Sequence, residues 1–95
     1  MVVGTGKIIF RLHGCNSLKE KRAIVKAMVN RIKNRFNISI AETAYNESLL
    51  KAEIGFSITG NNRRTVNSTM DKVFDMAENM GLAQIIDSEM EILSW

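Results

Sequence analysis

Four segments of the chain alternate between apolar and polar residues, a period of two that predicts strands with one buried face. The predicted strands span about residues 7–13, 37–45, 50–59 and 86–92. Asn46, Glu47 and Ser48 supply a turn between the second and third. The residues predicted to face inward are Ile8, Phe10 and Leu12; Ile38 and Ile40; Leu50, Ala52, Ile54, Phe56 and Ile58; and Ile86, Ser88, Met90 and Ile92.

Two other segments repeat apolar residues at the spacing of an amphipathic helix. Ser17 and Glu20 form a capping-box pattern, which predicts a first helix over residues 17–35. A second helix follows Asn62 and ends near Gly81, a residue type suited to the position after a helix. The predicted buried stripes are Leu18, Val25, Met28, Val29, Ile32 and Phe36 in the first helix and Val66, Met70, Val73, Ala77 and Met80 in the second.

The resulting order is βαββαβ. Right-handed crossovers then predict a single ferredoxin-like α+β domain over residues 1–95, with a four-stranded antiparallel sheet of strand order 4-1-3-2 and two helices on one face. The polar face of each predicted strand agrees, because helices cover only one side of such a sheet. Gly4-Thr5-Gly6 has no strand before it and no helix after it, so it is not a dinucleotide-binding loop. We expect it to be a flexible start to the first strand.

The composition is that of an ordinary globular protein, with 45% apolar and 24% charged residues. The start of the chain has no apolar segment of the kind found in signal peptides, and no apolar run approaches the ~20 residues that cross a bilayer. Cys15 is the only cysteine, which excludes an internal disulfide and a cysteine-cluster metal site. We expect a cytoplasmic protein that does not contact membranes.

Candidate catalytic groups are few. His13 and Cys15 lie two residues apart, but a nucleophile also needs an orienting third group, and the chain has no second histidine. Glu42, Glu47 and Glu53 lie in or near the predicted hairpin, with nothing to distinguish one carboxylate as an acid and another as a base. We therefore expect a non-enzymatic domain with no cofactor and no metal. A small-molecule enzyme or sensor is the remote alternative.

Charge is distributed unevenly along the chain. Residues 1–40 hold nine Lys and Arg against one acid, whereas residues 41–95 hold four against nine. Either the two halves neutralise each other across the folded surface, or the basic half faces a polyanion. On a helical wheel four cations of the first helix fall within an arc of about 60° and extend over roughly 20 Å, without acids beside them. These residues, Lys19, Arg22, Lys26 and Lys33, predict a contact face for RNA or the ribosome, the alternative being a solvated helix surface.

Two further basic features accompany this helix. Arg63 and Arg64 begin the second helix, where cations oppose the helix dipole and a bound anion would offset the cost. Topology predicts that they lie near the cations that end the first helix: Arg31, Lys33 and Arg35. Screening by solvent could equally make them harmless. Lys21 has a wheel angle within the buried stripe, and we expect its side chain to extend along its neighbours to solvent.

The uncovered face of the sheet lacks the aromatic residues on which RNA-recognition domains stack bases. Lys7 and Arg11 are expected to face the acids of the last strand, Asp87, Glu89 and Glu91, across the neighbouring strands. Three apolar residues on this face or at the chain end, Ile9, Leu93 and Trp95, predict an alternative role in protein interaction or homodimerisation.

The segment Ser17-Leu18-Lys19-Glu20-Lys21-Arg22 resembles a motif of the YlxP-like family, small bacterial proteins that carry a domain of unknown function. The resemblance continues through residues 35–42, Arg-Phe-Asn-Ile-Ser-Ile-Ala-Glu, and through 52–55, Ala-Glu-Ile-Gly, and covers nearly the whole chain. It implies a ferredoxin-like fold and no particular activity. Genes of this family often accompany genes for translation and ribosome maturation, which is an association with RNA only.

Overall fold

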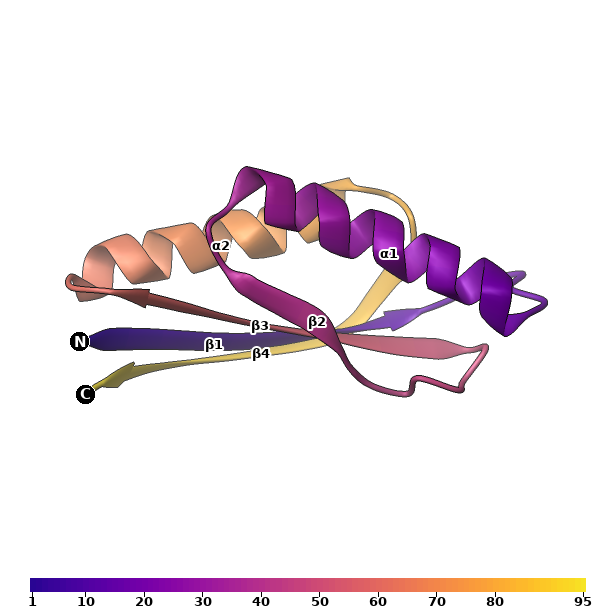
Figure 1. The fold of residues 1–95 in the computed structure, drawn as a ribbon, viewed down its shortest axis with the longest axis horizontal. Helices are drawn as coiled ribbons and strands as arrows, with labels where there is room; N and C mark the ends of the chain where they lie inside the picture. Colours follow the sequence, from indigo (N-terminus) through magenta and orange to yellow (C-terminus); the bar gives the residue numbers. More distant parts are fainter.

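The structure is a computed structural model that describes all 95 residues. Its elements follow one another as β1 (Val2–Arg11), α1 (Leu18–Arg35), β2 (Ser39–Ala44), β3 (Lys51–Gly60), α2 (Arg63–Asn79) and β4 (Gln84–Ser94) (Figure 1). The predicted βαββαβ order is therefore confirmed. The molecule is elongated, with principal extents of 43 × 20 × 18 Å, because long strands and long helices run along one axis.

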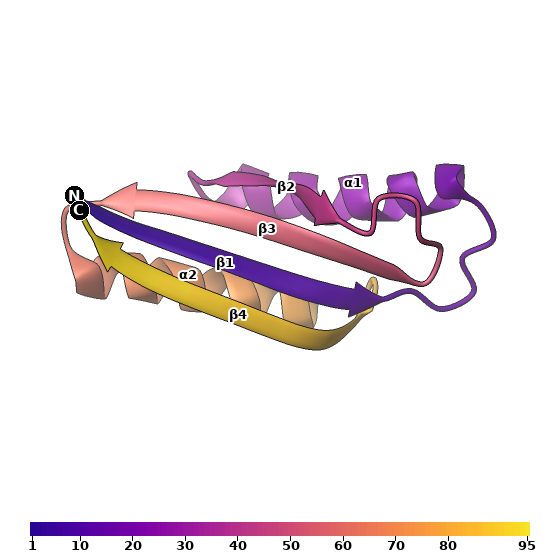
Figure 2. The same cartoon turned by 90° about the horizontal axis from the view of Figure 1, so that it is seen from below.

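The four strands form one antiparallel sheet in the order β2-β3-β1-β4, which is the predicted order (Figure 2). β1 lies at the centre and pairs along its whole length with β3 on one side and β4 on the other. The long central pairing places Val2 opposite both Gly60 and Ser94. The two ends of the chain consequently lie side by side, and the Trp95 amide donates to the Met1 carbonyl at 2.7 Å.

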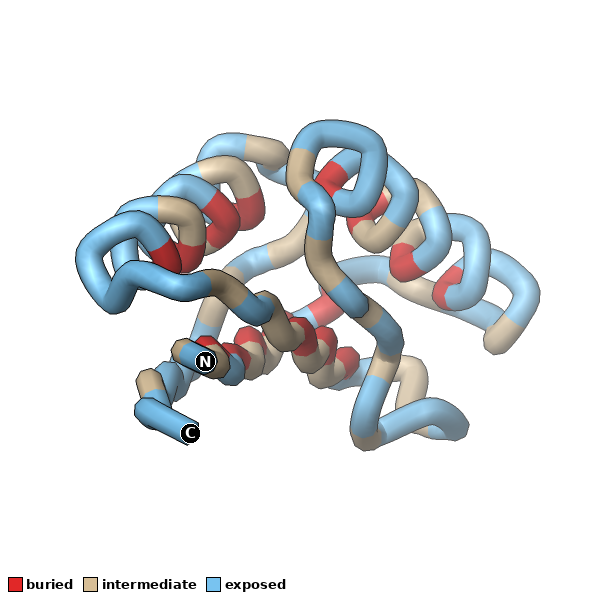
Figure 3. The backbone as a smooth tube through the Cα atoms, turned by 60° about the vertical axis from the view of Figure 1, so that its left-hand side comes forward, coloured by how far each residue is buried: buried red, intermediate tan, exposed pale blue.

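Both helices lie on one face of the sheet and turn their buried sides toward it (Figure 3). α1 covers the β2 side and α2 covers β1 and β4. Between the layers lies one apolar cluster whose buried members come from α1, α2, β1 and β3. They are Ile8, Phe10, Val25, Met28, Ile32, Ala52, Ile54, Phe56, Val66, Met70, Val73 and Ala77. Neither helix is long and apolar enough to span a membrane.

The segment predicted to be a flexible start is the first half of β1, and this expectation was wrong. Gly4 and Gly6 are buried on the helix-facing side, where they pair with Ile58 and Phe56 of β3. A Cβ atom on Gly6 would lie 2.5 Å from the Phe56 ring, and one on Gly4 would overlap the sulfur of Met70 in α2. Glycine is required here because neighbouring side chains occupy the space over the strand, not because the backbone must be flexible.

Four residues expected to face inward are exposed: Leu50, Ile86, Ser88 and Met90. Ser88 and Met90 pair with Ile8 and Gly6 on the helix-facing side, but β4 is an edge strand that the helices cover incompletely. β4 contains a bulge at which Ile9 pairs with Asp87 and Phe10 pairs with Ile85, so one residue is inserted between them. This shift brings Ile85 to the core and leaves Ile86 42% exposed. Leu50 lies in the hairpin before β3 begins, and its amide donates to the Ser48 hydroxyl. The turn, and not the alternation of the strand, therefore sets the direction of its side chain, which is 63% exposed.

The contact over Gly6 yields a test of the packing. Gly6→Ala should lower the free energy of unfolding by about 1–3 kcal/mol, because the added methyl group overlaps the Phe56 ring in a filled core. Urea denaturation measures the change, and Thr5→Ala on the exposed side of the same strand is the control. Phe56→Leu should relieve the overlap, so the double variant must lose less stability than the sum of the two single losses. Strict additivity would contradict the explanation.

Candidate functional site

Helix α1 begins with a capped first turn that sets its direction over the sheet. Ser17 Oγ accepts from the Glu20 amide at 3.1 Å, as the capping box predicts. Glu20 returns to the Asn16 amide, also at 3.1 Å, and not to that of Ser17. Glu20 is the only acid in α1, and it lies in the first turn. There its negative charge interacts favourably with the helix dipole, and its carboxylate accepts from an amide that has no partner within the helix.

The four cations predicted to form a contact face are all exposed on α1. Lys19, Arg22, Lys26 and Lys33 recur along the helix, and none of them lies within 4.0 Å of a carboxylate. We call this set the α1 basic face. The spacing of the four residues along an ordinary α-helix extends the face over roughly 20 Å. Because no side chain neutralises it, the face presents an uncompensated positive field to solvent.

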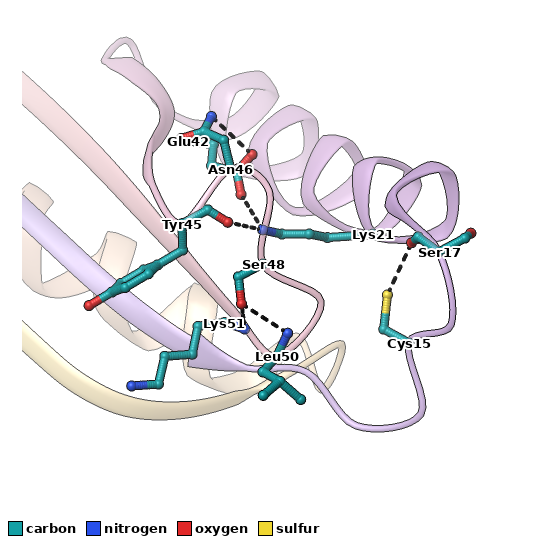
Figure 4. A network of polar contacts seen from close by, with 9 residues as sticks. All are labelled: Cys15, Ser17, Lys21, Glu42, Tyr45, Asn46, Ser48, Leu50 and Lys51. Carbon is teal, nitrogen blue, oxygen red and sulfur yellow. Dashed lines mark hydrogen bonds and ion pairs between the residues drawn. The ribbon is translucent and has the colours of Figure 1, made fainter.

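Lys21 does not extend to solvent, contrary to expectation. It is 0% exposed, and its Nζ lies 3.1 Å from Oε2 of Glu42 on β2 and donates to the Tyr45 carbonyl (Figure 4). The Glu42 side chain is itself only 15% exposed. The sequence held the signal for this pair, since Lys21 falls in the buried stripe of α1 and Glu42 shares the inward parity of Ile38 and Ile40.

The buried pair also fixes the hairpin that follows β2. Tyr45 adopts a left-handed conformation with φ of 61°, which turns its carbonyl toward Lys21 Nζ. Ser48 closes the turn, because its amide donates to the Tyr45 carbonyl at 2.9 Å and its hydroxyl accepts from Leu50 and Lys51. Lys51 Nζ then lies 5.6 Å from the centre of the Tyr45 ring, a cation–π arrangement. Lys21 therefore joins α1 to β2 and to the loop between β2 and β3.

Arg63 and Arg64 occupy the first turn of α2, behind an Asn62 cap that accepts from the Arg64 and Thr65 amides. Both arginines are exposed, and Arg63 Nη1 donates to the Ile92 carbonyl of β4 at 3.4 Å, on the side away from α1. The expected proximity to Arg31, Lys33 and Arg35 was wrong, because α1 ends beside the later turns of α2 and not beside its first turn (Figure 1).

A hollow of about 750 Å³ lies where α1 ends beside those later turns. We call it the interhelix hollow. Its lining includes Arg31 and Arg35 from α1 and Lys72 and Asp75 from α2. Sequence reasoning missed Lys72 and Asp75, since the crossing position of the two helices decides which of their exposed residues meet.

On the uncovered sheet face the predicted charge match forms in part. Lys7 Nζ lies 3.6 Å from Glu89 of β4 and 3.8 Å from Glu53 of β3, so two acids of the second half neutralise a cation of the first. Arg11 pairs with no acid, because Gln84 of β4 and Lys51 of β3 lie opposite it. Of the cations in the first half of the chain, Lys7 is thus paired on this face and Lys21 beneath α1, whereas the α1 basic face has no paired cation.

The three residues expected to form an interface do not lie together. Ile9 pairs with Asp87 and Glu53, between acids, while Leu93 pairs with Val3 six residues further along β1. Six residues of strand span about 20 Å. Leu93 is exposed and Trp95 is 89% exposed, both at the end of the sheet where the chain termini meet.

The candidate catalytic residues have separate partners. His13 Nε2 lies 2.9 Å from Gln84 Oε1, whereas Cys15 Sγ donates to the Ser17 carbonyl at 3.5 Å. Of the hairpin carboxylates, Glu42 is paired with Lys21 and Glu53 accepts from Thr43 Oγ1 at 2.7 Å. No three His, Cys, Asp or Glu side chains gather closely enough to hold a metal ion.

The element order, the antiparallel sheet and the helices on one face define a ferredoxin-like α+β domain. The chain belongs to the family of proteins of unknown function called DUF503, whose sequence profile matches residues 3–90. The resemblance to a YlxP-like family is thereby confirmed. The uncharacterized protein YlxP of Bacillus subtilis (strain 168) is 31% identical over 62 residues, which are 65% of this chain and 67% of that protein.

Two de novo designed proteins share the architecture. Foldit4 superposes with a TM-score of 0.54 at 9% identity, over 99% of this chain and 97% of the design. The design LFR1 1, described as having a ferredoxin fold, gives 0.53 at 12% identity, over 100% of this chain and 91% of the design. At such identity the likeness shows the fold alone.

The Lys21–Glu42 pair can be tested by a double-variant cycle. Lys21→Met should lower the free energy of unfolding by about 3 kcal/mol, because it leaves the Glu42 carboxylate largely buried without a cation. Lys21→Met with Glu42→Met should recover most of that loss, since two apolar side chains need no partners. Lys26→Met on the exposed face is the matched control and should change stability by less than about 0.5 kcal/mol.

Urea denaturation monitored by circular dichroism of the wild type, Lys21→Met, Glu42→Met and the double variant provides the four values of the cycle. If the double variant were as unstable as Lys21→Met alone, the lost stability would come from the lysine's packing and its contact with the Tyr45 carbonyl. The ion pair would then not hold α1 to β2.

Proposed function

We propose that this domain binds a polyanion, in the first place RNA, through the α1 basic face. The observation that carries the proposal is the absence of any carboxylate within salt-bridge distance of its four cations. Glu20, the only acid in α1, accepts from the Asn16 amide, and Glu42 of β2 pairs with Lys21. The face therefore keeps its whole charge for a ligand.

The expected mode of binding is contact with phosphates. Lysine and arginine on a helix surface neutralise phosphates and release counterions, which gives affinity that falls steeply with salt. Such contacts fix the position of a nucleic-acid strand and do not distinguish bases. Arg63 and Arg64, at the far end of α2, would supply a separate second contact for a longer RNA.

Charge removal tests the face. Replacing Lys19, Arg22, Lys26 and Lys33 with Ser should abolish most binding to a structured RNA hairpin. It should also reduce the slope of log affinity against log salt by about 3–4, since each of the four lost phosphate contacts contributes about 0.7–0.9. Fluorescence anisotropy over a salt series measures both quantities. The substituted residues are exposed, so unfolding temperature should change little.

The matched control compares equal losses of charge. Lys26→Ser with Lys33→Ser removes two charges from the α1 basic face, and Arg11→Ser with Lys51→Ser removes two exposed charges from β1 and β3. Only the first pair should weaken binding strongly. Equal weakening by both pairs would mean that net charge alone attracts RNA, and unchanged binding by the fourfold variant would remove this face from the proposal.

A second candidate function is homodimerisation at the end of the sheet. It is favoured by the exposure of Leu93 and Trp95 beside the paired chain ends. Aromatic residues are frequent anchors in such contacts. Sedimentation velocity at micromolar concentration should then show a dimer that Trp95→Ala converts to a monomer. A wild-type protein that sediments as a strict monomer would exclude this function.

A further inference from the structure

Three cations line the interhelix hollow, together with apolar side chains and an acid. Arg31 and Arg35 approach from the last turns of α1, and Lys72 approaches from the middle of α2. No carboxylate, that of Asp75 included, lies within salt-bridge distance of these cations. Three cations held around one concavity repel one another, and an anion placed among them would offset that repulsion.

Apolar side chains complete the lining. Phe36, Met76 and Met80 are half-buried, pack against the apolar core and also line the hollow. An aromatic ring and two thioethers form a surface on which a flat, polarisable ring can stack. A volume of about 750 Å³ falls within the range of pockets that take small organic ligands, which runs from about 300 to 1,000 Å³.

One acidic and one uncharged polar side chain also line the hollow. Asp75 and Asn79 lie one turn apart on α2 and both line the hollow. A carboxylate can only accept hydrogen bonds, so Asp75 favours a ligand with an amino group and disfavours a carbonyl in the same place. Cations that can bind a phosphate, an apolar surface that can hold a base, and a hydrogen-bond acceptor are three features that together recognise one nucleotide.

We propose that the interhelix hollow holds one unstacked nucleotide of a single-stranded RNA segment. Its phosphate lies among Arg31, Arg35 and Lys72, its base lies on the apolar surface, and Asp75 accepts from an exocyclic amino group. Cytosine carries such an amino group at the position where uracil carries a carbonyl, so cytosine is preferred over uracil. This inference rests on the proposed function, because the RNA that reaches the hollow is bound along the α1 basic face.

The path between the two sites crosses the outer surface of α1 near its end, where the exposed residues Asn30 and Asn34 carry no charge. The helix with its side chains is about 10–12 Å across. A duplex on the α1 basic face must therefore continue as a single strand of a few nucleotides to reach the hollow. A blunt duplex cannot occupy it.

The experiment uses RNA hairpins of one stem, either blunt or with a 3′ or 5′ extension of about four cytidines or four uridines. Anisotropy should show that all hairpins bind and that a cytidine extension on one of the two ends raises affinity. The hairpin with that cytidine extension should bind roughly tenfold more tightly than the hairpin with the matching uridine extension. Asp75→Asn should erase the preference for cytidine while leaving or raising affinity for the blunt hairpin, because it removes an acid near the cations.

A charge-matched pair of variants locates the effect. Arg31→Gln with Arg35→Gln should lose the gain from the extension, whereas Arg11→Gln with Lys51→Gln, on the exposed side of β1 and β3, should keep it. A blunt hairpin that binds with no gain from any extension would overturn the hollow as a nucleotide site and leave the α1 basic face standing. Failure of every hairpin to bind would overturn the proposed function itself. A cytidine preference that survives in Asp75→Asn would overturn the role of Asp75.

Discussion

The ion pair between Lys21 and Glu42 links the parts of this molecule that packing alone leaves separate. α1 packs on the sheet through an apolar stripe, and apolar contacts are non-directional, so they allow the helix to slide or rotate. The Lys21–Glu42 ion pair requires one short distance between two atoms and therefore opposes both movements. Lys21 also holds the Tyr45 carbonyl, so the same side chain fixes the helix, the edge strand and the hairpin beside it. A lysine without exposure is tolerated only because both of its partners lie within reach.

This pair has an electrostatic consequence for the surface. Without Lys21, Glu42 would be an unpaired acid on the strand beneath α1. The ion pair neutralises the negative charge of Glu42. Glu20 is likewise held at the cap. The cations on the outer side of α1 therefore face no opposing charge, while Lys7 on the uncovered sheet face has two acids beside it. The fold separates a neutralised face from a basic one.

The architecture itself carries no function. Two de novo designed proteins share it at 9–12% identity, which shows how few requirements the βαββαβ fold places on its surface. What distinguishes this chain from an idealised sheet is local: glycines on β1 that admit Phe56 and Met70, a bulge in β4, and a buried lysine. Each of these sets the position of a charged group or of the helix that carries it.

The sequence by itself determined the elements, their order and the basic side of α1, because a period of two or of 3.6 is a local property of the chain. It also held the inward position of Lys21, although its partner lies 21 residues away and only the folded chain brings them together. Tertiary structure alone decided the bulge that exposes Ile86, the packing over Gly6 and the meeting of Arg35 with Lys72 and Asp75. These features depend on strand register and on where two helices cross, and such relations between distant segments leave no periodic signal in the residues.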